Sequence, residues 1–304
     1  MRNVRLKLAI LDMYADTPNQ GMRAIKEIVR GYEHVLDWKV FDVRSQCDLP
    51  DTSFDIYISS GGPGHPLDGD GIWDQQFFHL LDELWLHNRS AKGPKKYVFF
   101  ICHSFQMACH HFGLASITQR KSRSFGTFPA HKTEDGQQDS LLQILPDPFY
   151  IADFRDYQVV QPDWKALEGM NAQILALEKI RPHVPLERAI MAVRFSEEFF
   201  GTQFHPEADP HGMMKYFGQE EKKQEIIKEH GVEKFEQMME DLNDPLKIPL
   251  THQMIIPGFL NQAVEALQKQ YSDQPAAATN ISQEKPPSNN TPHRYDKSDQ
   301  GAVQ

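Results

Sequence analysis

The chain has 304 residues, of which 40% are hydrophobic and 24% are charged. These values are close to globular averages, so they predict one large domain or a domain with an extension and exclude a largely disordered chain. The net charge of −10 disfavours nucleic acid and anionic membranes as general partners. The apolar stretch 8–11 is too short for a signal sequence or a membrane span, so we expect an unexported, cytoplasmic protein.

The first half of the chain alternates predicted strands and helices. Nearly continuous apolar runs predict strands over 5–11, 38–43, 54–59 and 97–101. Apolar residues at helical spacing predict helices between them over 22–29 and 77–85, and a third over 105–112. This order predicts an α/β domain with a mostly parallel sheet.

The second half predicts a different arrangement. Short apolar runs indicate further strands, some of them antiparallel, over 149–152, 157–160, 174–177, 189–193 and 199–204. Beyond Gly212 the pattern becomes helical, and Pro257 is predicted to begin the last helix. From Ser272 large aliphatic side chains are nearly lacking, which predicts disorder. The expected organisation is therefore a domain over 1–210, a helical extension over 211–270 and a disordered tail over 271–304.

Three cysteines, Cys47, Cys102 and Cys109, are too few for a dense disulfide framework. Cys102 and Cys109 lie among histidines, but a helix would spread these side chains over different faces, and their spacing matches no common zinc pattern. We therefore expect no metal and no cofactor, and a cysteine free for chemistry.

Cys102 follows a predicted strand and precedes a predicted helix. Such a junction is typical of a nucleophile elbow, where a sharp turn lifts the side chain above the sheet and the helix N-terminus favours a thiolate. A buried structural cysteine is the alternative interpretation, because cysteine is among the most frequently buried residue types.

His205 and Glu207 lie in the segment Phe204-His205-Pro206-Glu207, after the last predicted strand. In an extended segment residues i and i+2 share a side, so Glu207 is placed to orient His205, and His205 to take the proton of Cys102. The alternative is a solvated surface loop in which both side chains have no catalytic role.

Ser60-Gly61-Gly62-Pro63-Gly64 follows the third predicted strand. Its glycines allow close approach of the backbone to a ligand, so the amides of Gly62 and His103 are candidates for an oxyanion hole, and Gly64 is a candidate substrate contact. The alternative is a tight structural turn. The loop lacks the Lys-Ser/Thr ending of a phosphate-binding loop.

Together, the glycine loop, Cys102 with Gln106 four residues later, and Phe-His-Pro-Glu resemble the class I (triad) glutamine amidotransferase family over about residues 5–210. The nearest relatives by this resemblance are the amidotransferase domain of GMP synthetase and its stand-alone counterparts. The resemblance implies a flavodoxin-like fold with helices on both faces of the sheet. It also implies a triad of Cys102, His205 and Glu207, a γ-glutamyl thioester on Cys102, and contact of Gln106 with the substrate.

Two segments depart from that family's pattern. Its elbow is commonly Gly-x-Cys-x-Gly-x-Gln, whereas Phe100 and Ser104 stand at the two glycine positions here. The Ser-His segment that helps to seat the substrate is replaced by residues 152–157, in which Arg155 either binds a substrate carboxylate or pairs with Asp153 or Asp156.

The sequence thus predicts an amide hydrolase acting on glutamine or a similar small amide. Residues after about 210 are too few for a synthetase domain and carry no nucleotide loop, so any ammonia acceptor is expected on a separate protein. Two alternatives remain at this stage. One is a noncatalytic regulatory or binding module on the same fold; the other is a related cysteine-triad hydrolase or acyltransferase with another substrate.

Overall fold

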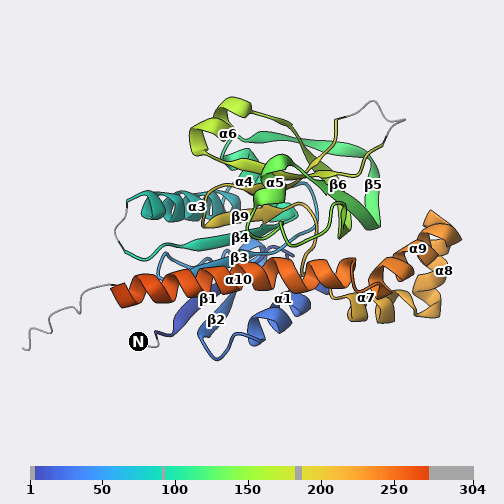
Figure 1. The fold of residues 1–304 in the computed structure, drawn as a ribbon, viewed down its shortest axis with the longest axis horizontal. Helices are drawn as coiled ribbons and strands as arrows, with labels where there is room; N and C mark the ends of the chain where they lie inside the picture. The colour runs from blue at the N-terminus through green and yellow to red at the C-terminus, as the bar shows by residue number, and fades with distance from the viewer. Residues whose placement is uncertain (1–3, 91–92, 182–186, 274–304) are drawn as a thin grey trace, which may run out of the picture. The chain divides into compact units, whose positions relative to one another are not determined.

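The computed structural model describes residues 4–90, 93–181 and 187–273, in which strands and helices alternate from β1 to β7 and four consecutive helices follow β9 (Figure 1). The strands are β1 (Leu6–Asp12), β2 (Leu36–Asp42), β3 (Ile56–Ser59), β4 (Tyr97–Ile101), β5 (Ala115–Lys132), β6 (Phe149–Pro162), β7 (Gln173–Glu178), β8 (Ile190–Arg194) and β9 (Phe199–Thr202). The helices are α1 (Gly21–Arg30), α2 (Val43–Gln46), α3 (Trp73–Arg89), α4 (His103–His111), α5 (Glu134–Gln138), α6 (Trp164–Met170), α7 (Pro210–Phe217), α8 (Glu220–His230), α9 (Val232–Asn243) and α10 (Ile248–Asp273). Of the expected tail, residues 271–273 belong to α10, and the rest lies outside the described residues.

The described strands form a nine-stranded sheet in the order β2-β1-β3-β4-β9-β8-β7-β5-β6. Strands β2, β1, β3, β4 and β9 are parallel neighbours. Strands β8, β7, β5 and β6 continue the sheet with antiparallel pairing. The predicted α/β fold, with a parallel first half and antiparallel strands in the second, is confirmed.

Alternate residues of β1 reach opposite faces of the sheet. Leu8 and Ile10 enter a core shared with α1 and α10, whereas Ala9 and Leu11 enter a second core shared with α3 and α4. Burial on both faces explains why the strand is a nearly continuous apolar run, interrupted only by the exposed Lys7, and does not alternate apolar with polar residues. Helices cover both faces, as the sequence resemblance implied.

Two elements differ from the sequence prediction. The long strand β5 was not expected, because much of residues 116–124 is polar and solvent-exposed, and β5 is instead held by its pairing with β6. Pro257 does not begin the last helix but lies inside α10. Ile255, Ile256 and Phe259 are buried on both sides of the proline, so their packing outweighs the missing backbone donor.

Helices α7 to α9 and the start of α10 share a third apolar cluster built on Phe217, Phe235 and Met238. Phe125 of β5 and Phe154 of β6 pack against it. These helices therefore belong to the same compact unit as the sheet.

Candidate active site

The parallel strands β1, β3, β4 and β9 are neighbours, so their carboxyl ends meet at one edge of the sheet. This edge is the usual place for ligands in open α/β sheets. The segments that follow these strands contain Tyr14, the glycine loop 60–64, Cys102 and His205. The fold therefore brings the predicted site segments together.

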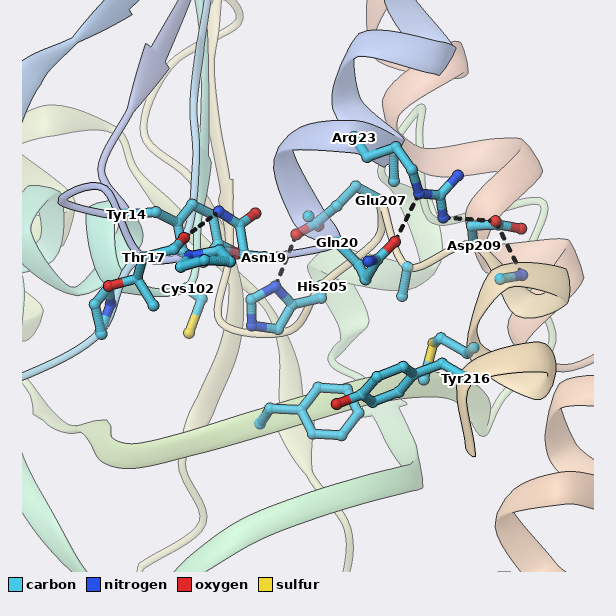
Figure 2. Close-up of a pocket in the computed structure, with 18 of the residues that line it drawn as sticks. Tyr14, Thr17, Asn19, Gln20, Arg23, Cys102, His205, Glu207, Asp209 and Tyr216 are labelled. Atoms are coloured by element: carbon cyan, nitrogen blue, oxygen red, sulfur yellow. Dashed lines mark hydrogen bonds and ion pairs between the residues drawn. The ribbon is translucent and has the colours of Figure 1, made fainter. Parts of the chain in front are cut away.

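Cys102 lies between β4 and α4 with φ 48° and ψ −96°. A positive φ at a non-glycine residue is strained, and such strain concentrates at functional sites. The Cys102 amide donates to the carbonyl of Thr202 over 2.8 Å, which holds the turn against β9. The residue is only 5% exposed but lines a pocket (Figure 2). The strand–turn–helix junction predicted at Cys102 is present.

Phe100 is accommodated by a glycine on the neighbouring strand. Phe100 of β4 is fully buried and pairs with Gly201 of β9. A Cβ atom on Gly201 would lie 2.7 Å from Cδ2 of Phe105 in α4 and 3.2 Å from Cβ of Phe100. Gly201 thus leaves the space that Phe100 and Phe105 occupy next to the turn at Cys102.

Ser104, at the second altered elbow position, is part of the turn. Its hydroxyl donates to the carbonyl of Ser59 over 2.9 Å and accepts from the amide of Ile101 over 3.0 Å. One buried side chain therefore ties the end of β3 to the end of β4. The serine is compatible with the turn and adds a connection that a glycine cannot make.

His205 is held between Glu207 and Cys102. The His205 amide donates to the carbonyl of Ala152 in β6 over 2.9 Å. Its ring Nδ1 donates to Oε1 of Glu207 over 2.8 Å, and Glu207 is 1% exposed. The other ring nitrogen points toward Cys102 (Figure 2). The segment thus brings thiol, imidazole and carboxylate together.

The electrostatics of this group favour a charged imidazole. Burial opposes protonation of His205, but the neighbouring Glu207 and Cys102 outweigh it and raise the pKa of His205 well above its usual value. A buried carboxylate therefore stabilises the protonated imidazole in its fixed orientation.

The glycine loop packs tightly against the end of β1. A Cβ on Gly62 would lie 2.3 Å from the Met13 carbonyl oxygen, and one on Gly61 would lie 2.9 Å from Cε1 of His205. At Gly62 only glycine fits without movement of the backbone, whereas a side chain at Gly61 would displace the His205 ring. Gly64 has φ +86° and is exposed, and it is not among the described residues that line the pocket.

The amides of Gly62 and His103 have no protein acceptor among the hydrogen bonds of the described residues. His103 is the first residue of α4, and the first backbone amides of a helix have no acceptor within the helix. Both amides are thus free to donate to a ligand, and their role as an oxyanion hole stays a prediction. The His103 ring is buried, and burial followed by the nearby Arg44 and His65 lowers its pKa to about 3, so the ring is neutral.

Two predicted substrate contacts do not reach this pocket. Nε2 of Gln106 donates to Oε1 of Gln203 over 3.0 Å and to the Tyr157 carbonyl over 3.1 Å. Arg155 is buried and donates to both carboxylate oxygens of Asp153 over 2.9 and 3.0 Å. Neither is among the described residues that line the pocket. The structure therefore places Arg155 in its alternative role, an ion pair with Asp153.

Gln203, which sequence reasoning missed, contacts the thiol. Its Nε2 donates to the Cys102 sulfur over 3.7 Å, while its Oε1 accepts from Gln106. A chain of two hydrogen bonds thus connects Gln106 to Cys102 through Gln203. The signal was available, because Gln203 directly precedes the Phe-His-Pro-Glu segment.

Tyr14 was also missed. A Cβ on Gly21 would lie 2.5 Å from the Tyr14 hydroxyl oxygen, and one on Gly61 would lie 3.2 Å from it. Burial, then the charges of Glu207 and Cys102, raise the pKa of Tyr14 well above its usual value. The phenol is therefore a neutral donor beside the thiol and the carboxylate. Its position directly after β1, at the carboxyl edge of the sheet, is the signal that identifies it.

The pocket has a volume of about 390 Å³. Cys102, His205 and Glu207 form part of its lining, together with residues from the loop after β1, from α1, from β5 and β6, and from α7. Among the described residues no group of three His, Cys, Asp or Glu side chains is arranged to hold a metal ion. The described helices also include none that is long and apolar enough to cross a membrane.

The profile of the family Glutamine amidotransferase class-I matches residues 19–221. The chain therefore belongs to the class I glutamine amidotransferase family, whose members are typically amidotransferases or hydrolases. No curated protein matches the sequence significantly.

Solved structures agree on the fold. A glutamine amidotransferase from Thermotoga maritima matches with a TM-score of 0.63 at 15% identity, over 86% of this chain and 99% of that one. The protein SMU.1228c matches with a TM-score of 0.58 at 19% identity, over 85% of this chain and 99% of that one. A glutamine amidotransferase from Methylobacillus flagellatus matches with a TM-score of 0.53 at 15% identity, over 88% of this chain and 94% of that one. At these identities the similarity establishes the fold alone.

Proposed function

We propose that the chain hydrolyses the side-chain amide of glutamine, or of a similar γ-glutamyl compound, through Cys102, His205 and Glu207. One observation carries the proposal. His205 is bonded to Glu207 through Nδ1 and turns its other nitrogen toward Cys102, on a strained elbow at the base of a pocket. A nucleophile, a base and a group that orients the base are the parts that acyl transfer requires.

In this mechanism His205 takes the thiol proton, and the sulfur of Cys102 attacks the amide carbonyl. The developing oxyanion accepts hydrogen bonds from the amides of Gly62 and His103. His205 then gives its proton to the leaving nitrogen, the carbon–nitrogen bond breaks, and a γ-glutamyl thioester remains on Cys102. Water, deprotonated by His205, cleaves the thioester and regenerates the thiol.

In this proposal the acceptor of the ammonia is bound by a separate synthetase-type protein. The likeness of the chain to the amidotransferase part of GMP synthetase belongs to the same proposal. The binding-module alternative is disfavoured, because strain at Cys102 and burial of Glu207 both cost free energy and gain nothing in a protein that only binds.

The test is an assay of ammonia and glutamate release from glutamine, with mass spectrometry of the protein. We expect turnover and a γ-glutamyl adduct on Cys102 in the wild type, and loss of both in Cys102→Ala. His205→Ala is expected to lower kcat at least a hundredfold, the scale of general acid–base catalysis. Cys47→Ser is the matched control, because Cys47 follows the last residue of α2 and is not among the described residues that line the pocket. Full activity of Cys102→Ala would refute the proposal.

A further inference from the structure

The wall of the pocket beyond His205 is aromatic. Phe125 and Phe154 project from β5 and β6, and their ring centroids are 5.2 Å apart. Phe217 of α7 contacts both rings, at 6.1 and 6.5 Å. Met213 and Tyr216 of the same helix complete this wall, and Tyr216 lies across the pocket from His205 (Figure 2).

This wall lies on the His205 side of the pocket. The lining passes from His205 through Glu207 and Asp209 to α7, whereas Gln106 and Arg155 do not contribute to it. In the proposed mechanism His205 protonates the leaving nitrogen. A substituent on that nitrogen would therefore extend past the imidazole, where the Phe154 ring lies 6.1 Å from the His205 ring.

The volume of the pocket allows an amide larger than glutamine. Its volume of about 390 Å³ falls in the range of roughly 300–1,000 Å³ typical of sites for larger organic ligands. The leaving group of glutamine is ammonia, which contacts no aromatic wall. An exposed aromatic surface stabilises a complex only when an apolar group displaces its water.

Charges near the wall define the substituent further. Arg23 is paired with Glu27 at 2.6 Å and with Asp209 at 2.9 Å, so this group of one cation and two carboxylates keeps one negative charge. Arg123, also in the lining, is exposed and forms no salt bridge within the described ranges. Arg123 brings one positive charge to the lining and the Arg23 group keeps one negative charge, so the lining offers no net charge to a charged substituent. The fitting substituent is therefore uncharged.

We infer that the preferred substrate is an N-substituted γ-glutamyl amide whose leaving amine carries an uncharged aryl or alkyl group. The inference rests on the proposed function and specifies its substrate class. In the reaction the carbon–sulfur bond forms at Cys102, the carbon–nitrogen bond breaks, and His205 delivers its proton to the amine. Water then releases glutamate from the thioester, so the products are glutamate and a free aryl or alkyl amine.

The experiment compares kcat/KM for glutamine, γ-glutamyl benzylamide and γ-glutamyl 1,4-diaminobutane, whose substituent is cationic. We expect the benzylamide to be hydrolysed at least tenfold better than either of the others, the scale of discrimination by an apolar pocket. Tyr216 is 39% exposed, so its replacement should leave the fold intact. Tyr216→Ala is expected to lower the benzylamide-to-glutamine ratio about fivefold or more, whereas Tyr216→Phe keeps the ring and the ratio.

Trp164→Ala is the matched control, because Trp164 is 69% exposed on α6 outside this pocket. Its ratio should equal that of the wild type. Equal or better hydrolysis of glutamine, or a ratio that Tyr216→Ala does not change, would overturn the substrate assignment while the proposed function stands. Failure of all three amides to react, with no adduct on Cys102, would instead overturn the proposed function.

Discussion

The phenol of Tyr14 is a neutral donor that lies beside the groups proposed to react. It lines the pocket, and its raised pKa reflects burial and the charges of Glu207 and Cys102. Tyr14→Phe keeps the ring and removes the donor, so we expect the fold to persist and kcat to fall about tenfold, the equivalent of one hydrogen bond to a charged group. Stopped assays of amide hydrolysis measure the effect.

Tyr32→Phe is the matched control for Tyr14→Phe. The Tyr32 hydroxyl bonds to the Pro257 carbonyl and to Asn261 of α10, away from the pocket. This variant should lose some thermal stability and no kcat. An unchanged kcat in Tyr14→Phe would show that the phenol has no part in the reaction.

Gly62 is a second position where the addition or removal of a single atom is expected to change activity. A methyl group there would lie 2.3 Å from the Met13 carbonyl, which is backbone and cannot turn aside. Gly62→Ala is therefore expected to displace the loop, lower the melting temperature and reduce kcat/KM more than a hundredfold if the Gly62 amide stabilises the oxyanion.

Gly169→Ala tests whether any added methyl group has this effect. Gly169 lies within α6, and an added Cβ would meet nothing within 4 Å. Alanine in a helix is favoured over glycine by about 0.5–1 kcal/mol, so this variant should be more stable than the wild type and equally active. If both variants behave alike, the close approach of Gly62 to Met13 has no functional role.

At the scale of elements, β4, β9 and α4 share the space around the elbow. Gly201 leaves room for Phe100 and Phe105, and an added Cβ would lie 2.7 Å from Phe105. We expect Gly201→Ala to destabilise the protein by about 1–3 kcal/mol, the usual cost of overpacking a core. In a double-mutant cycle, urea unfolding should show a smaller cost of Gly201→Ala when Phe105→Ala has already removed the ring. Additive costs would contradict this account of the elbow.

The same elements show what the sequence could predict and what it could not. Strands such as β1 and β4 are apolar runs buried on both faces, so their pattern alone identifies them. β5 is held mainly by pairing with β6 and has an exposed polar stretch, so its residues carry no such signal. Inside α10, tertiary packing outweighs the unfavourable helix propensity of Pro257, and a prediction from local propensity does not include that packing.

The candidate site also contains residues that the sequence could predict and residues that it could not. Cys102, His205 and Glu207 follow strand ends that the apolar pattern marks, so their convergence could be anticipated. Arg155 could not be assigned, because Asp153 lies two residues away on the same strand face, and only the fold shows that their pairing keeps Arg155 from the pocket. The aromatic wall was also hidden, since Phe125, Phe154 and Phe217 come from separate elements.

For the whole molecule, the buried His103 ring makes the stability depend on pH. Its Nε2 is buried and has no hydrogen-bond partner within the described part of the chain, and burial, followed by Arg44 and His65, lowers its pKa from 6.5 to about 3. The His103 imidazole is therefore protonated below pH 6.5 in the unfolded chain, but only below about pH 3 in the folded chain. The contribution of the neutral His103 ring to the free energy of unfolding is thus fully present above pH 6.5 and is lost as the pH falls toward 3. At pH 4 the loss is on the order of 3 kcal/mol.

His103→Phe should remove this part of the acid sensitivity, because phenylalanine fills a similar space and does not titrate. We expect the difference in unfolding free energy between pH 7 and pH 4, measured by urea titration, to be smaller in His103→Phe than in the wild type. Other groups titrate in both proteins, so only the difference between the two reports on His103. His79→Asn is the control, since the His79 side chain is 74% exposed and should leave the wild-type dependence unchanged. Parallel pH profiles for His103→Phe and the wild type would mean that the His103 ring takes up its proton equally in the folded and unfolded chains.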